Sequence, residues 1–78
     1  MNSTGDRRRG VVTRLKPELG YGFIRPDGGT IQDDHFFHRI GVAAESRKGF
    51  MDLVEGTRVE FEEEASSKGP RATNVLAL

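Results

Sequence analysis

Rings recur at alternate positions in two short segments of this 78-residue chain. Tyr21 and Phe23 are separated by one residue, and Phe36 and His38 repeat that spacing. Side chains at alternate positions of a β-strand point to the same face, so each segment presents a pair of rings on one side. Exposed rings stack on unpaired nucleobases with little preference for sequence. The chemistry indicated by these residues is stacking, and the expected partner is a single-stranded nucleic acid.

Other kinds of site find less support in the same residues. His35 and His38, with Asp33 and Asp34 beside them, carry atoms that bind metals, but their spacing along a strand turns the imidazoles to opposite faces. No serine, histidine and carboxylate set has the context of a catalytic motif, and no glycine-rich loop ends in the lysine that cradles phosphate. We therefore expect no metal, no cofactor, no small-molecule substrate and no enzymatic activity.

Composition limits the chain to one small domain. A chain of 78 residues buries only about 60 to 65 % of its unfolded surface, which excludes a second domain. There is no cysteine and no apolar stretch near the roughly 20 residues that cross a bilayer, so we expect a cytoplasmic protein without membrane contact. Twelve basic and twelve acidic side chains cancel, which argues against a purely electrostatic binder. We expect a monomer, with a weak dimer as the alternative.

Alternation and turn residues predict an all-β chain. The predicted strands are residues 11–15, 20–25, 35–39, 57–62 and 71–78. Pro17 ends the first of them, and residues 40–56 form a long loop with at most a short helical turn. Short strands with turn signals and no convincing helix indicate a small barrel. The domain proper is expected to span residues 10–78.

Residues 1–9 are predicted to form a flexible basic arm, because the segment is small and polar and ends in Arg7, Arg8 and Arg9. Two roles remain open for it: an arm that grips phosphate, or a solubilising tail. At the other end of the chain, Glu60 and residues 62–64 are interpreted as a solvated strand end, which would repel a nucleic acid crossing that side.

Period-two alternation also divides the strands into two faces. The predicted interior residues are Val12, Ile24, Phe37, Val59, Phe61 and Val75, joined in the last strand by Ala72 and by Leu76 or Leu78. With these side chains inside, the rings of Tyr21, Phe23, Phe36 and His38 are forced to the outer face. Rings gathered on an outer face need a functional reason.

The segments Gly20-Tyr21-Gly22-Phe23-Ile24 and Phe36-Phe37-His38 resemble the ribonucleoprotein-type motifs of bacterial cold-shock proteins. The similarity continues through residues 49–50, 53–56, 59–61 and 68–75, so that it covers almost everything from Gly10 onward. It implies a five-stranded antiparallel OB-fold barrel whose second and third strands present the ligand face. It also implies an RNA chaperone or regulator of gene expression that prefers pyrimidine-rich strands, and Phe50 matches a family position that adds a further stacking ring.

The chain departs from that pattern at two stacking positions. Arg14 stands where the family usually has tryptophan, and Arg39 stands where an aromatic residue follows the motif histidine. A guanidinium stacks on bases and also pairs with phosphate, so we expect weaker and more salt-dependent binding. Lys16, Arg25 and Lys68 are further candidates for phosphate contacts.

The alternative hypothesis is a barrel that kept the fold but now binds another protein, with weak or lost nucleic-acid binding. The zero net charge and the missing aromatic residues at positions 14 and 39 permit it. Fold alone does not distinguish the two functions.

Overall fold

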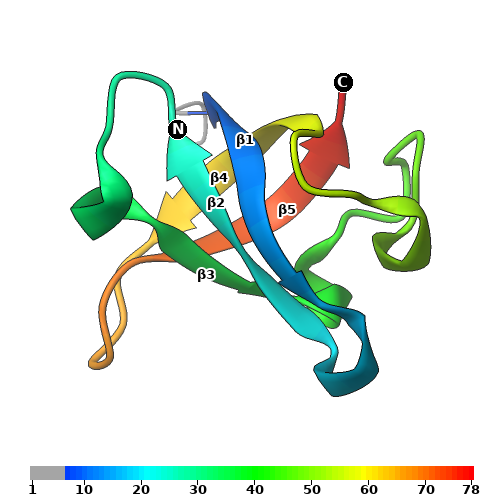
Figure 1. The fold of residues 1–78 in the computed structure, drawn as a ribbon, viewed down its shortest axis with the longest axis horizontal. Coiled ribbons are helices and arrows are strands. Elements are labelled where there is room, and N and C mark those ends of the chain that lie inside the picture. Colours follow the sequence, from blue (N-terminus) through cyan, green and yellow to red (C-terminus); the bar gives the residue numbers. More distant parts are fainter. Residues whose placement is uncertain (1–6) are drawn as a thin grey trace, which may run out of the picture.

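Five strands close into a barrel in the computed structural model, which describes residues 7–78 (Figure 1). The strands are β1 (Arg7–Lys16), β2 (Tyr21–Pro26), β3 (His35–His38), β4 (Arg58–Glu64) and β5 (Arg71–Ala77). Around the barrel they follow the order β1-β2-β3-β5-β4, and β1 pairs with β4 to close it. All neighbours are antiparallel except β3 and β5. The predicted all-β, five-stranded barrel is confirmed, with one parallel seam that the sequence does not indicate.

Single-turn 3-10 helices join the strands. They are η1 (Pro17–Leu19), η2 (Ile31–Asp33), η3 (Arg39–Gly41) and η4 (Phe50–Asp52), and the last two lie in the long loop predicted between β3 and β4. Proline fixes φ and lacks an N–H, so the ladder stops at Pro17 as predicted. Gly20, with φ 76°, then turns the chain into β2. No helix within residues 7–78 is long and apolar enough to cross a membrane.

The barrel interior contains the side chains that alternation assigned to it. Each of the following is at most 1 % exposed: Val12, Ile24, Phe37, Val59, Phe61 and Val75. In β5 the prediction was only partly right, because Ala77 is buried while Leu78 is exposed and Leu76 is half-buried. Asn74 has a positive φ of 48°, and the β4–β5 register shifts between Glu60 and Glu62, so the alternation is interrupted there.

A second irregularity, in β1, decides which way Arg14 points. Val12 pairs with Ile24 and Arg14 pairs with Phe23, so Thr13 is an extra residue in β1. Strict alternation from Val12 would direct Arg14 inward. The bulge moves Arg14 to the outer face and turns Leu15 toward the core, against which it packs.

Arg7, Arg8 and Arg9 belong to the barrel, which corrects the predicted boundary at residue 10. They are the first residues of β1 and pair with Glu62, Phe61 and Glu60 of β4. Antiparallel pairing with β4 gives their backbone a ladder partner, and the neighbouring glutamates attract their side chains. The rest of the predicted arm, residues 1–6, lies outside the described residues.

One buried polar residue connects two strands that are not neighbours in the sheet. His35 of β3 is 3 % exposed, and its ring lies 5.5 Å from the ring of Phe61. Nδ1 is 2.7 Å from the carbonyl oxygen of Asp33, which can only accept, so Nδ1 donates. Nε2 is 2.6 Å from Oε2 of Glu63, a β4 carboxylate that also receives a hydrogen bond from Arg8.

The absence of a side chain at position 22 is a packing requirement. A Cβ built on Gly22 would lie 2.7 Å from the carbonyl oxygen of Arg14 and 2.9 Å from Cε1 of Phe37. We predict that Gly22→Ala lowers the free energy of unfolding by about 1 to 3 kcal/mol, as overpacking does in well-filled cores. Gly49→Ala is the control: its φ is −75° and its new Cβ would meet nothing within 4 Å. Urea unfolding that ranks the two variants equally would contradict this explanation.

Acid should weaken the contact between β3 and β4. The hydrogen bond from His35, assisted by Arg8, holds the pKa of Glu63 below its ordinary value of 4.5. A carboxylate with a lowered pKa stabilises the folded state above its ordinary pKa, and this contribution is lost as the pH falls through the lowered value. We therefore predict that Glu63→Gln destabilises the protein at neutral pH and that the difference from the native chain shrinks on acidification. Urea unfolding over a pH series tests this, and a difference independent of pH contradicts it.

Candidate nucleic-acid interface

Three aromatic rings form one cluster on the outer face of β2 and β3. Ring centroids are 5.4 Å apart for Tyr21 and Phe36, 5.9 Å for Phe23 and Phe36, and 6.0 Å for Tyr21 and Phe23. Phe23 pairs with Phe36 across the strands, and all three rings are partly exposed. Their packing against one another fixes the rings while part of each remains open to solvent.

His38 completes the row on β3, directly opposite Tyr21 in the register. Its Nδ1 accepts a hydrogen bond of 3.2 Å from the backbone N–H of Ile40. In the neutral ring the proton is therefore on Nε2, which becomes a donor for a ligand. His35 and His38 lie on opposite faces, one buried and one partly exposed, as their spacing predicted.

Two arginines flank the ring cluster. The Cζ atom of Arg14 is 5.9 Å from the centroid of Phe23, and the Cζ atom of Arg71 is 5.8 Å from that of Phe36. The bulge in β1 thus places Arg14 where a stacking residue was expected. Arg71 was missed by sequence reasoning, because only the parallel pairing of β3 with β5 places it beside Phe36.

Two hollows lie along the seam between β3 and β5. One, of about 580 Å³, is lined by Phe23, Phe36 and residues 66–71 of the β4–β5 connection. The other, of about 520 Å³, is lined by His38, residues 40–44 and residues 71–74. Arg71 lines both hollows, so a strand that occupied both would pass this residue.

The other predicted cations differ in how available they are. Lys16 is exposed and in register with Tyr21, and Lys68 lines the larger hollow. Arg39 is exposed, and its Cδ would lie 3.4 Å from a Cβ built on Gly20.

Arg25 is the weakest of the expected phosphate contacts. Its Nε and Nη2 atoms donate to Asp34 at 2.8 and 3.3 Å, which raises its pKa above the ordinary value. Asp34 also accepts a hydrogen bond from Thr13 at 3.2 Å. A phosphate would have to displace this carboxylate to reach the guanidinium.

Phe50 does not join the stacking surface, which corrects the prediction for this residue. It is 8 % exposed and packs edge-on against Phe37, with the ring centroids 5.9 Å apart. The phenyl side chain at the start of η4 belongs to the buried core cluster, and its burial there removes apolar area from water. In this structure Phe50 is a core residue.

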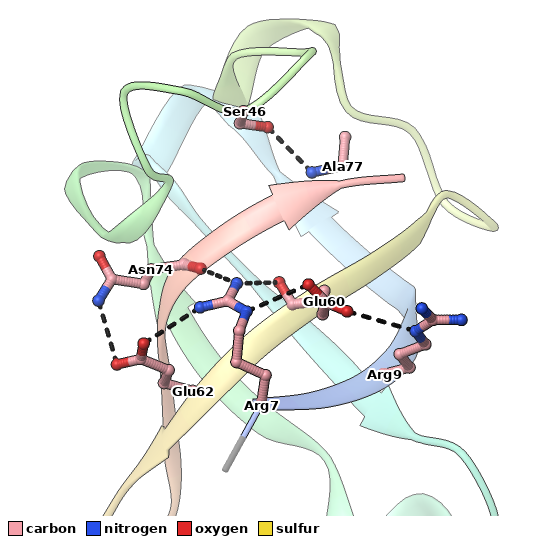
Figure 2. Close-up of polar contacts among 7 residues, drawn as sticks. All are labelled: Arg7, Arg9, Ser46, Glu60, Glu62, Asn74 and Ala77. Atoms are coloured by element: carbon pink, nitrogen blue, oxygen red, sulfur yellow. Dashed lines mark hydrogen bonds and ion pairs between the residues drawn. The ribbon is translucent and has the colours of Figure 1, made fainter. Parts of the chain in front are cut away.

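The cations of the β1–β4 side are already paired, as Figure 2 shows for Arg7 and Arg9. Arg7 contacts Glu60 at 3.2 Å and Glu62 at 3.1 Å, and it donates to the carbonyl oxygen of Asn74 at 2.8 Å. Arg9 contacts the second oxygen of Glu60 at 3.3 Å. These contacts, above all the hydrogen bond from Arg7, hold the pKa of Glu60 below its ordinary value. Of the predicted acidic strand end, Glu60, Glu62 and Glu63 are therefore paired with the N-terminal arginines, while Glu64 forms no ion pair within residues 7–78.

The outer face of β2 and β3, which has the ring cluster and is called the ring face, differs from the β1–β4 side because its cations are mostly unpaired. Within residues 7–78, seven cations have no ion pair to a carboxylate: Arg14, Lys16, Arg39, Arg47, Lys48, Lys68 and Arg71. Arg14 and Arg71 flank the rings, Lys16 is in register with Tyr21, Arg39 follows His38 and Lys68 lines the larger hollow, whereas Arg47 and Lys48 lie in the loop between β3 and β4. Although the chain as a whole is neutral, most of the unpaired cations of residues 7–78 are therefore next to the aromatic cluster or its hollows.

Comparison with known proteins gives one consistent family. The model of the 'Cold-shock' DNA-binding domain matches residues 8–78. Cold shock-like protein CspE of Escherichia coli (strain K12) is 43 % identical over 70 residues, covering 90 % of this chain and 94 % of that protein. Cold shock protein CspB of Geobacillus stearothermophilus is 41 % identical over 71 residues, covering 91 % and 98 %.

A solved structure supports the same fold. The structure described as drosophila Unr CSD456 superposes with a TM-score of 0.70 at 26 % identity and covers 94 % of this chain. The chain spans only 27 % of that longer protein, so the likeness concerns one domain of it.

Proposed function

Because this chain belongs to the 'Cold-shock' DNA-binding domain family, we propose that it binds single-stranded RNA or DNA across the outer face of β2 and β3. Bases stack on Tyr21, Phe23, Phe36 and His38, while the neighbouring cations hold the phosphates. The observation that carries the proposal is the cluster of partly exposed rings, 5.4 to 6.0 Å apart, on the face that has the unpaired cations.

Stacking on unpaired bases accounts for the affinity for single strands and for the opening of RNA hairpins that this binding would cause. Each base stacked on an aromatic ring contributes about 1 to 3 kcal/mol, with little dependence on sequence. Arg14 and Arg39 replace part of the missing stacking surface and add phosphate contacts. A protein that binds open strands and not duplexes shifts RNA away from hairpins, so chaperone activity needs no nucleotide hydrolysis. The ligands we propose are short pyrimidine-rich strands bound by a monomer in the cytoplasm, a compartment that fits the absence of cysteine.

The protein-interaction hypothesis loses its main support from the pairing of charges. It was based on the zero net charge, which offers no field to attract phosphate, and on the missing aromatic residues at positions 14 and 39. Glu60, Glu62 and Glu63 of β4 form ion pairs with the β1 arginines, and this leaves other cations to act on a ligand at the ring face. A protein partner therefore remains the outcome to pursue only if oligonucleotides fail to bind.

Removing single rings should weaken binding and leave the fold intact. We predict that Phe23→Ala and Phe36→Ala each weaken binding of an unstructured pyrimidine-rich oligonucleotide by about 5- to 150-fold, the loss of one stacked base. Fluorescence anisotropy with a labelled strand measures this, with a duplex of equal length for comparison.

Val54→Ala is the matched control, because Val54 is apolar and 60 % exposed in the loop before β4, away from the described rings. It should bind as the native chain does. Circular dichroism must show that the ring variants stay folded at the assay temperature. Native affinity in both ring variants, or failure of the native chain to bind even at low salt, refutes the proposal.

The salt dependence of binding should separate free from paired cations. Arg14 and Arg9 belong to the same strand, but only Arg9 has a carboxylate partner. We predict that Arg14→Gln lowers the slope of log K against log salt by about 0.7, the value for one phosphate contact on a single strand. Arg9→Gln should leave the slope unchanged. Equal changes of the salt slope in both variants would show that ion pairing within the protein does not decide which cations contact phosphate.

A further inference from the structure

We infer that Arg71 is a specificity-determining residue that recognises guanine at the nucleotide stacked on Phe36. The inference rests on the proposed function and adds to it a base preference at one position. It starts from a half-buried cation that has no ion pair and whose Nε atom has no hydrogen-bond partner among residues 7–78.

The Nε–H donor of Arg71 is buried and has no acceptor within residues 7–78. Glu64 is opposite Arg71 in the β4–β5 register, yet the two side chains form no ion pair. A buried donor left unpaired costs free energy in the unbound protein, and a ligand that supplies an acceptor relieves this cost.

The position of Arg71 favours contact with a base. Its guanidinium carbon is 5.8 Å from the centroid of Phe36, and Arg71 lines both hollows along the β3–β5 seam. A base that packs against Phe36 in the larger hollow therefore lies next to the guanidinium of Arg71.

Guanine is the base whose acceptor atoms best match the N–H donors of the Arg71 guanidinium. Its N7 and O6 atoms are adjacent acceptors, and arginine donates to both in the commonest specific contact to a base. Cytosine also presents adjacent acceptors, N3 and O2, when it is unpaired. The larger ring system of guanine covers more of Phe36, and the hollow of about 580 Å³ beside that ring has room for a purine.

The test uses a short oligothymidylate and derivatives with a single guanine, cytosine or adenine at each position in turn. We expect guanine at one position to strengthen binding to the native protein by about 5- to 150-fold over adenine, the range for one bidentate contact. Replacing that guanine by 7-deazaguanine, which lacks the N7 acceptor, should remove most of the gain. This comparison of guanine with 7-deazaguanine uses the native protein and needs no variant.

Two substitutions separate a base contact from a charge. Arg71→Gln should abolish the difference in affinity between the guanine and adenine strands. Arg71→Lys keeps the charge without the planar guanidinium, and an ammonium also donates to N7 and O6, so it should retain part of the preference.

Three results overturn the inference and leave the proposed function standing: equal affinity for all bases at every position, a preference for cytosine over guanine, or a preference that survives Arg71→Gln. An equal fall in affinity for all strands together with a smaller salt slope in Arg71→Gln assigns the residue to phosphate, and also overturns it. Failure of the native chain to bind any oligonucleotide overturns both proposals.

Discussion

The register between β2 and β3 is the constraint on which the interface depends. Ile24 and Phe37 are fully buried, so their strands cannot slip by one residue without exchanging core and surface. With this register fixed, Phe23 faces Phe36 and the three aromatic rings meet within 6.0 Å. The same burial that closes the barrel therefore also builds the stacking surface. No separate interaction is needed to gather the rings.

Pairing of charges within the barrel resolves the conflict between zero net charge and a nucleic-acid partner. Arg7 and Arg9 neutralise Glu60, and Arg8 shares Glu63 with His35. These ion pairs hold the first residues of β1 on β4, where closure of the barrel requires them. Exposed ion pairs add little stability one by one, but they take carboxylates out of the field that a phosphate meets. Arg14, Lys16, Lys68 and Arg71, which lie beside the rings and hollows, have no such partner within residues 7–78.

The sequence was informative wherever strict alternation holds. The interior residues of β2, β3 and β4 and the ring face follow directly from period two. The bulge at Thr13 and the positive φ of Asn74 are different, because each depends on contacts with a neighbouring strand that a local pattern does not contain. Phe50 and Arg7 were misplaced for a related reason: burial in the core cluster and pairing with β4 are long-range outcomes. Arg71 also needed the register of β5 before its place was visible.

The central claim is that a single strand lies across β2, β3 and the start of β5. The most direct measurement is a titration of the isotope-labelled native protein with a short unstructured oligothymidylate, followed residue by residue in ¹H–¹⁵N spectra. The account predicts that the largest shifts of the backbone signals occur at Tyr21, Phe23, Phe36, His38 and Arg71, with little change in Arg7–Arg9 or in β4. Shifts concentrated on the β1–β4 ion pairs, or no shifts at saturating oligonucleotide, would contradict it.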